Sequence, residues 1–576
     1  MLKLHQEEVV SEKSMSGPND IEPTKTSEEN KLDAIIVEIG QFGPFQVFNY
    51  ILLCLPIICN AFYSISYVFT AGDVPHRCNI TLCDGVDSRY EEQFLNFTTP
   101  QRHGNWVQCE QYAVRNDIAG EPSCNVSSFD MAQRVPCDAG YKLRDDEKTI
   151  ASEFGLFCAD QWKLSMVGTV NNIGQFVGIP LGGYFADRYG RKFILVSAGI
   201  LSSFAGLARS YAPEYYSFLC LEFLDMVVGS TLFPTAFLLA VELVGPKHRV
   251  LTATMISLTY GLAEALMGYM AKYLPDWRVL LRVLYTPALL HLIFICVLSE
   301  SVRWLLSQSK EMDAQTILRR VAQINRKPLS EHQLNELILS NRRMVAQSSA
   351  AGGHYSFRQI FQALGCRTAL CCFVWFTHTL VALGLSLHSA QLSGRKFENF
   401  SMTGLMQLPG ILMATTLMNW IGRRRALSSC QFTCAVLLLA VAATDAVHPV
   451  TSSTLYFLAK MTSTGSFMIL YFFTSEIFPT NCRNCMLSFC SSMGRFGSML
   501  SPQTTLLIPY YKYGPHLLFA LFCFTCSVLV LFFPETTNKV LPTTLAEARA
   551  LDKISVVKHV ADCSFSSPCM SGCTHV

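Results

Sequence analysis

The sequence predicts an all-α protein that crosses a membrane twelve times, in two halves of six helices each. Half of its 576 residues are hydrophobic, only 15% are charged, and the mean hydropathy is +0.29. That composition is too apolar for an ordinary soluble enzyme of this length. Apolar stretches of nearly the ~20 residues that cross a bilayer recur along the chain. Short motifs between the first stretches also recur between the later ones.

The first 44 residues are polar and charged, and we expect a mostly disordered cytoplasmic arm here. They lack the early apolar core of a cleaved signal peptide. The first apolar stretch, at 45–69, is therefore expected to remain in the protein as a transmembrane helix.

A polar segment at 70–161 is expected to form a small disulfide-containing extracellular loop. It combines an even number of cysteines with acceptor sites for N-glycosylation, and both features are typical of an oxidising compartment. The pairing of the cysteines stays open, and unpaired cysteines in a disordered loop are the alternative. The cysteines are Cys78, Cys83, Cys109, Cys124, Cys137 and Cys158, and the acceptor asparagines are Asn79, Asn96 and Asn125.

The rest of the chain alternates between apolar spans and short connections. Five further spans are expected within 162–298, a cytoplasmic central loop at 299–366, six spans within 367–534, and a cytoplasmic tail at 535–576. Lysines and arginines gather in the connections on one side, which indicates the cytoplasmic side. The cysteine-containing segment then falls on the opposite side. We expect both termini in the cytoplasm and the protein in the plasma membrane.

An internal repeat relates the two halves. Glycine–arginine and glutamate–arginine patterns in cytoplasmic connections of the first half return 232 to 235 positions later with the same internal spacing. The matches are Gly190 and Arg191 with Gly422 and Arg423, Glu242 and Arg249 with Glu476 and Arg483, and Glu300 with Glu535. Transporters built from such repeats bind substrate between the halves, near the bilayer midplane.

The motifs also carry a family resemblance. The stretch GGYFADRYGRK at 182–192 resembles the cytoplasmic signature of the major facilitator superfamily. The cysteine-containing loop after the first span is similar to that of the organic cation, anion and carnitine transporters, solute carrier family 22. Further matches are IGQFGPFQ at 39–46, DWR at 276–278, GLSL at 384–387, EIFPTNCRN at 476–484 and FPET at 533–536. The resemblance covers nearly the whole chain and implies alternating access around a central site.

The chain departs from the family pattern in three places. SESVRWL at 299–305 lacks two prolines of the family motif, and Asn419 and Trp420 replace the expected acidic and basic residues. Ala382 and Leu383 replace an aromatic pair before GLSL. These departures argue against the broad substrate range of drug-type cation carriers.

Ionisable residues inside the spans are the candidates for substrate binding, because each costs ~2.5 kcal/mol or more to insert near a helix centre. Glu264 in the fifth span and Arg495 in the eleventh are the clearest. The resemblance places Arg495 where anion and carnitine carriers have an arginine. Its guanidinium can form a bidentate pair with a carboxylate, and Glu264 can meet an ammonium. In the alternative, the two pair with each other or with other polar groups of the protein.

Four aromatic residues are expected to line the site and to offer a ring face to a cation, with ordinary helix packing as the alternative. They are Tyr260, Trp375, Phe376 and Phe496.

Five other ionisable residues within the spans are weaker candidates. Glu222, Asp225 and Lys460 are expected near span ends, where solvation is an equally good explanation. His291 and His378 fit local hydrogen bonding better than proton relay.

Charged motif residues on the cytoplasmic side are expected to form ion pairs that join the halves when the outside is open and break when the inside opens. A role in orientation alone is the alternative. These gating candidates are Asp187, Arg188, Arg191, Glu242, Arg249, Arg423, Glu476 and Arg483.

Together these features predict a plasma-membrane transporter of small organic zwitterions or cations, such as carnitine, β-alanine or a quaternary amine. An organic-anion exchanger is the nearest alternative, and a non-transporting receptor is a weaker one. No catalytic constellation, nucleotide-binding motif or zinc-ligand spacing is apparent, so neither enzymatic activity, a cofactor nor a metal is expected. Nucleic acid is not expected as a partner either. The carboxyl-terminal Thr574 and Val576 fit a ligand for PDZ domains.

Overall fold

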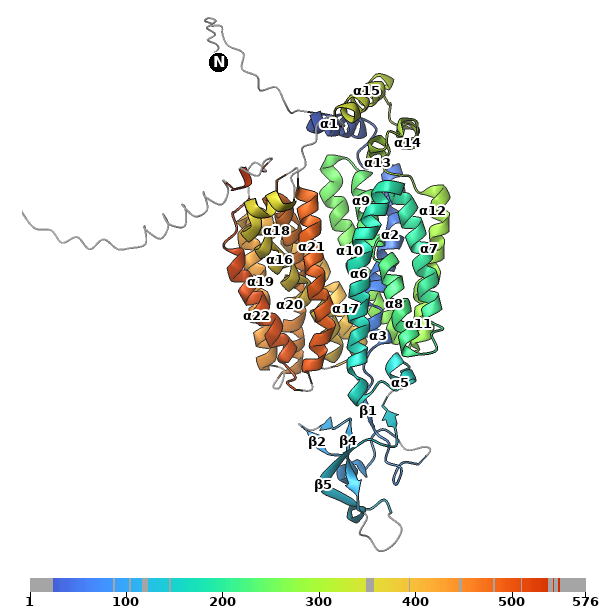
Figure 1. Ribbon diagram of the computed structural model, residues 1–576, viewed down its shortest axis with the longest axis vertical. Helices are drawn as coiled ribbons and strands as arrows, with labels where there is room; N and C mark the ends of the chain where they lie inside the picture. The colour runs from blue at the N-terminus through green and yellow to red at the C-terminus, as the bar shows by residue number, and fades with distance from the viewer. Residues whose placement is uncertain are drawn as a thin grey trace, which may run out of the picture.

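A computed structural model of the protein describes residues 24–85, 89–102, 105–115, 123–144, 147–348, 357–392, 394–444, 448–479, 482–508, 510–536, 542 and 547–549. Figure 1 shows two helical halves side by side, a small domain with strands at one end, and helices of the central loop at the other. We call residues 70–161 the disulfide domain, and name the two ends of the helical bundle the disulfide-domain side and the motif side.

Each half contains the six expected spans, some of them built from two consecutive helices. In the first half these are α2 Pro44–Ile65 with α3 Tyr67–Thr70, α6 Trp162–Tyr189, α7 Arg191–Arg209, α8 Tyr215–Gly229 with α9 Leu232–Glu242, α10 Arg249–Tyr273, and α11 Trp277–Tyr285 with α12 His291–Val297. In the second half they are α16 Phe357–His388, α17 Lys396–Leu405 with α18 Gln407–Ile421, α19 Arg423–Thr444, α20 Pro449–Ile477, α21 Arg483–Leu500 and α22 Gly514–Val530.

The spans differ in how apolar they are. Within the described residues, seven helical segments are long and apolar enough to cross a membrane by length and composition, and Gly514–Val530 is a shorter apolar helix. More polar spans such as α6 and α21 carry side chains that bond to neighbouring helices: Asn171 donates to Glu222 of α8, and Arg495 donates to Gln175 of α6. The all-α membrane-spanning architecture predicted from the sequence is confirmed.

Glycines allow close helix packing in α6. A Cβ atom added at Gly182 would lie 2.0 Å from Thr231 Cγ2, and one at Gly178 would lie 2.2 Å from the Val227 carbonyl oxygen. The helix pair of the fourth span can approach α6 at these points only because glycine has no side chain. Gly183 has open space around its Cα instead.

The amino-terminal arm is more ordered than we expected from its polarity. Residues Thr24–Glu38 form helix α1, and Leu32, Ile35 and Ile36 bury their side chains. These residues lie three or four positions apart, so they share one face of the helix. The prediction of a mostly disordered arm was wrong for this stretch. Its amphipathic pattern is short, and the many charged residues around it made the segment look disordered.

The central loop forms three helices, α13 Val302–Ser307, α14 Glu311–Asn325 and α15 Glu331–Ser348. Asn325, at the end of α14, accepts a hydrogen bond from the Phe45 N–H at 3.1 Å and donates to the Ile39 carbonyl at 3.0 Å. A Cβ atom at Gly43 would lie 2.5 Å from the Asn325 side chain. The IGQFGPFQ motif therefore serves as the docking point of the central loop at the start of the first span.

The disulfide domain contains short antiparallel strand pairs. Strand β1 His76–Cys78 pairs with β6 Tyr141–Leu143, β2 Gln101–Arg102 with β3 Asn105–Trp106, and β4 Glu110–Val114 with β5 Phe129–Pro136. Its apolar core is small and centres on Cys78, Ile80 and Phe129. A domain with so little apolar burial depends on covalent cross-links.

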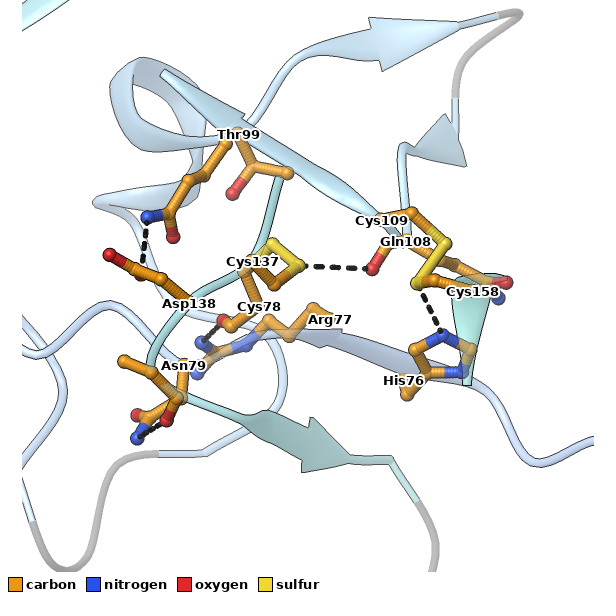
Figure 2. The surroundings of a disulfide bond; sticks show 12 residues. His76, Arg77, Cys78, Asn79, Thr99, Gln108, Cys109, Cys137, Asp138 and Cys158 are labelled. Carbon is orange, nitrogen blue, oxygen red and sulfur yellow. Dashed lines mark hydrogen bonds between the residues drawn. A yellow bond between two sulfur atoms is a disulfide. The ribbon is translucent and has the colours of Figure 1, made fainter. Parts of the chain in front are cut away.

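All six predicted cysteines form disulfides in this domain. The pairs are Cys78–Cys137, Cys83–Cys124 and Cys109–Cys158. Figure 2 shows the first pair at Cys78, the last residue of β1, and the third pair next to His76, the first residue of β1, with Arg77 between them. Arg77 and Asp84 form a bidentate ion pair, with distances of 2.6 and 2.7 Å, and both side chains are almost fully buried.

The DWR motif fastens this domain to the bundle. The Trp277 indole N–H donates to the Glu153 carboxylate at 2.7 Å, and Arg278 binds the same carboxylate at 2.6 Å. Glu153 belongs to α5 Ile150–Phe154, the last helix before α6 except for one 3-10 turn. The hydrogen bond from Arg278 holds the pKa of the Glu153 carboxyl below its usual range.

Candidate functional site

The two halves meet along α6, α10, α17 and α21, which lie on either side of the boundary between them in Figure 1. Towards the disulfide-domain side the contact is close. Thr169 donates to the Met499 carbonyl at 3.0 Å and accepts from Gln503 at 2.7 Å. A Cβ atom at Gly404 would lie 2.4 Å from the Ala265 nitrogen. The halves are thus packed against each other on this side in the present conformation.

Arg495 lies at this boundary, on the face of α21 that is turned to the first half. Its Nη1 donates to Gln175 Oε1 of α6 at 2.9 Å, and Tyr260 of α10 lies nearby. The side chain is partly exposed. Among the described residues, no carboxylate lies within ion-pair distance of the guanidinium. An arginine within a membrane span usually has an anionic partner, so Arg495 retains capacity for a ligand carboxylate.

Glu264 does have a protein partner, and that partner is Lys460. Lys460 Nζ of α20 lies 3.8 Å from Glu264 Oε1 of α10, and both side chains are about 5% exposed. Ser386 of α16 donates to the same carboxylate at 2.7 Å, and Gln407 of α18 donates to its other oxygen. Glu264 and Arg495 do not pair with each other. In this conformation Glu264 binds other polar groups of the protein, as the alternative to substrate binding anticipated.

The four predicted aromatic residues divide between the boundary and the interior of the second half. Tyr260 packs against Phe233 with ring centroids 5.4 Å apart, and Phe496 packs across the boundary against Phe176 at 5.2 Å. Trp375 is buried and donates from its indole nitrogen to Thr474, so ordinary helix packing explains it.

Phe376 also belongs to the interior, where its ring lies 5.8 Å from that of Phe522 within the second half. The sequence could not distinguish the aromatic residues at the boundary from those in the interior, because all four lie in apolar spans. The structure adds Phe237 and Tyr471, whose rings meet edge to face across the boundary with their centroids 6.5 Å apart.

A fully buried charge cluster lies inside the first half, where we had expected residues near span ends. Arg209 donates to Glu222 and lies 3.4 Å from Asp225, and all three side chains are inaccessible to solvent. Tyr285 and Ser202 donate to Asp225. The solvated interpretation of Glu222 and Asp225 was therefore wrong. Their partner Arg209 was not considered in the sequence analysis; it is the last residue of α7, where a basic residue is common.

Hydrogen bonds connect this cluster to Arg495. Asn171 donates to Glu222 at 2.7 Å, Gln175 donates to Asn171 at 2.9 Å, and Arg495 donates to Gln175. The side-chain amides of Asn171 and Gln175 on α6 thus hold the Arg495 guanidinium in its orientation. Lone asparagine and glutamine residues in an apolar span are a signal that could have identified this connection.

The two histidines are hydrogen-bonded locally. His291 Nδ1 lies 2.7 Å from the Ala288 carbonyl oxygen, and His378 Nδ1 lies 3.2 Å from Ser466 Oγ. His378 also stacks on Phe467 at 4.9 Å. Both histidines therefore have the local hydrogen bonds that the sequence analysis favoured over proton relay.

One group of potential metal ligands occurs among the described residues, in the disulfide domain. His76, Cys109 and Cys158 place their ligand atoms within 4.8 Å of one another. Figure 2 shows the two sulfur atoms joined in a disulfide, with His76 Nε2 directed at Cys158. Metal binding requires thiolates, so this group in its oxidised form has only the imidazole to offer.

Comparison with known proteins identifies the fold and the family. The family model "Sugar (and other) transporter" matches residues 126–544, which is well over half of the chain. This chain belongs to that transporter family. The partially occluded, inward-open xylose transporter XylE from E. coli has the same fold, with a TM-score of 0.58, 14% identity, and coverage of 86% of this chain and all of that one. The major facilitator fold predicted from the sequence is confirmed.

Curated relatives of this transporter agree with the predicted resemblance to solute carrier family 22. Solute carrier family 22 member 3 of Rattus norvegicus is 28% identical over 90% of this chain and 96% of the relative. Organic cation/carnitine transporter 2 of Mus musculus is 27% identical over 89% and 93%. The beta-alanine transporter of Drosophila melanogaster is 27% identical over 90% and 89%. The protein is thus a multi-pass membrane transporter of the major facilitator type.

The motif residues of the transporter form ion pairs, but within each half. Arg191 lies 3.0 Å from Asp187 and 3.5 Å from Glu242, all in the first half. Arg423 lies 3.3 Å from Glu476 in the second half. The expected pairs between the halves are absent from this conformation among the described residues. The sequence spacing showed which residues were equivalent, but it could not show whether they met inside or between the halves.

The remaining gating candidates bind elsewhere. Arg249 lies 2.7 Å from Asp33 of α1, so it fastens the amino-terminal helix rather than its sequence neighbour Glu242. Arg483 interacts electrostatically with Glu476. Arg188 is exposed and donates to the Tyr184 hydroxyl at 3.2 Å.

Equivalent glutamates complete the repeat on the motif side. Glu300 accepts from the backbone N–H groups of Arg191 and Lys192 at 3.2 and 3.1 Å, at the start of α7. Glu535 accepts from the Arg423 N–H at 3.0 Å, at the start of α19. Burial raises the pKa of the Glu300 carboxyl, against the opposing effect of these N–H donors. A carboxylate at a helix N-terminus stabilises the helix through its unpaired N–H groups and dipole.

Replacing Glu300 with Gln is expected to lower the stability of the transporter by about 1–2 kcal/mol, because charge-assisted hydrogen bonds to two helix-starting N–H groups become neutral ones. Glu535→Gln should have a similar effect, since the contacts are repeated. The measurement is thermal unfolding of the purified protein in detergent. The exposed Glu331, paired with Arg319 at 2.9 Å, provides the control, and Glu331→Gln should change stability little. Equal effects at Glu300 and Glu331 would contradict the capping role.

Proposed function

We propose that the protein carries small organic zwitterions or cations across the plasma membrane by alternating access. Relatives named for organic cations, carnitine and β-alanine support this substrate class. The internal repeat, with matching contacts in both halves, supports movement of the halves as rigid bodies around a site between them.

The observation that carries the proposal is the Arg495 guanidinium, which lies between the halves without a carboxylate partner among the described residues. A substrate carboxylate would complete its hydrogen bonding through a bidentate pair. The aromatic rings at the boundary offer faces to a substrate ammonium through cation–π attraction, and Tyr260 and Phe496 are the predicted members of this set. A molecule with both charges fits the pair of features best.

The proposed orientation places the disulfide domain outside the cell and the termini in the cytoplasm. Disulfides form in an oxidising compartment, and they support this assignment. Asn96 and Asn125 are exposed, as glycosylation acceptors must be. Asn79 is only partly exposed, and its amide donates to the Ala139 carbonyl at 3.2 Å, so it is the least accessible of the three. Thr574 and Val576, the proposed PDZ ligand, lie outside the described residues.

Uptake measurements in cells that express the protein test this function. Carnitine or β-alanine should accumulate above the level of control cells, in a saturable manner and without hydrolysis. Absence of uptake for carnitine, β-alanine and quaternary amines, with the protein present at the surface, would refute the substrate class. Uptake restricted to anions that lack an amine would favour the organic-anion exchanger. Saturable binding without accumulation would favour the non-transporting receptor.

A further inference from the structure

Lys460 and Glu264 form a charged contact between the two halves, deep in the membrane-spanning part. Lys460 lies on α20 and Glu264 on α10, with 3.8 Å between Nζ and Oε1. Ser386 lies between them, since its hydroxyl donates to Glu264 at 2.7 Å and accepts from Lys460 at 2.6 Å. Lys460 also donates to the Ala382 carbonyl at 3.0 Å. These contacts hold the Lys460 ammonium in one position beside the Glu264 carboxylate.

The contact belongs to the same site as Arg495. Tyr260 lies one helical turn before Glu264 on α10, a rise of ~6 Å, and it is near both Glu264 and Arg495. Gln407, which donates to Glu264, is on α18 at the same boundary between the halves. The Lys460–Glu264 pair and Arg495 therefore lie along the same boundary between the halves, with Tyr260 near both.

The pair decides the net charge of the site. Glu264 and Lys460 neutralise each other, which leaves Arg495 as the uncompensated charge of the three. An unpaired glutamate at this depth would be costly and would attract any small cation that entered. A lysine tethered next to it has a high effective concentration, so a soluble cation competes poorly for the same carboxylate.

We propose that Lys460 is a specificity-determining residue of this transporter: its ammonium fills the position beside Glu264 that a simple cation would otherwise occupy, and the site therefore selects substrates that bring a carboxylate to Arg495. This inference rests on the proposed function and deepens it, because it ranks zwitterions above simple cations. A substrate ammonium then rests on the aromatic faces of the boundary, not on Glu264.

Lys460→Gln tests the inference directly, because it removes the charge and keeps a polar group that can bond to Ser386. We expect tetraethylammonium uptake, divided by β-alanine uptake, to rise by about tenfold, the size expected for one charged contact. Lys460→Arg keeps a cation in place and should leave this ratio low. The double variant Glu264→Gln/Lys460→Gln has no free carboxylate, so its ratio should return towards the wild-type value.

Glu264→Gln supplies the reciprocal test and guards against poor folding of the first variant. It leaves Lys460 unneutralised, so uptake of glutarate, a dicarboxylate without an amine, should rise by about tenfold relative to β-alanine. Surface biotinylation reports the amount of each variant. Unchanged ratios in variants that reach the surface would overturn the inference. Failure of both single variants to reach the surface, with rescue by the double variant, would show a purely structural pair and would overturn it too.

The two levels of proposal fail in different ways. If wild-type cells take up neither carnitine nor β-alanine, the proposed function fails. Tetraethylammonium and glutarate uptake per surface transporter, compared with the wild type, then still decides the role of Lys460. If the wild type transports a zwitterion and the variants do not change selectivity, the inference about Lys460 fails alone.

Discussion

Replacing Arg495 with Ala should reduce uptake of carnitine and β-alanine by about 10- to 100-fold, because a charge-assisted bidentate contact with a carboxylate is lost. Arg495 is the charged residue at the boundary whose protein partner is an amide and not a carboxylate, among those that the structure describes. Uptake of tetraethylammonium, which has no carboxylate, should fall much less. Initial uptake rates in expressing cells, corrected for surface protein, provide the measurement.

Two further variants serve as controls. One tests whether positive charge alone at position 495 is enough for uptake, and the other tests whether loss of any arginine lowers uptake. Arg495→Lys keeps the charge but loses the planar fork, so it should recover only part of the uptake. Arg395 is an exposed arginine on the disulfide-domain side that pairs with Glu398 at 3.0 Å, and Arg395→Ala should have little effect. Carnitine and β-alanine uptake at wild-type rates in Arg495→Ala would refute the proposed carboxylate contact.

Arg209→Met should destabilise the first half by about 3–5 kcal/mol, the cost of breaking a buried ion pair and leaving its partners uncompensated. Arg209 donates to Glu222, Tyr285 and Ser66, and its side chain is fully buried. Without it, two carboxylates remain in an apolar interior. Loss of surface expression, and a lower unfolding temperature of the purified protein, provide the measurements.

Neutralising the carboxylates tests the cause of this loss. Adding Glu222→Gln and Asp225→Asn to Arg209→Met removes every charge of the cluster, so part of the stability should return. Arg319, in an exposed pair with Glu331, is the matched control, and Arg319→Met should change stability little. Equal losses at Arg209 and Arg319 would contradict a structural role of the buried cluster.

Much of the fold was predictable because the bilayer imposes length and hydropathy on each span. The repeated spacing of Gly190–Arg191 and Gly422–Arg423 predicted a duplication, and both glycines adopt positive φ angles, +109° and +88°, at equivalent turns. Such local signals survive in sequence because the turn requires glycine. The amino-terminal helix α1 was missed, because its apolar residues are few and its helix is held by contacts with α15 of the central loop.

The candidate site was predictable only in part. Arg495 and Glu264 were found because charges within spans are costly and therefore rare. Their different surroundings were not predictable. Lys460 and Ser386 are 196 and 122 positions from Glu264 in the chain, and only helix packing brings them to one carboxylate. Trp375 and Phe376 point into the second half for the same reason: the rotation of α16 about its axis is set by its neighbours.

The sequence by itself determined the twelve spans, the two related halves, the cysteine-rich segment and the rarity of charge inside the membrane, because each of these follows from local composition and spacing. Tertiary structure alone decided which cysteines pair and that the motif charges form ion pairs within a half. It also decided that Arg209 neutralises Glu222 and that Lys460 pairs with Glu264. These outcomes depend on distances between residues far apart in the chain. No local pattern encodes such distances, and the packing of the helices sets them.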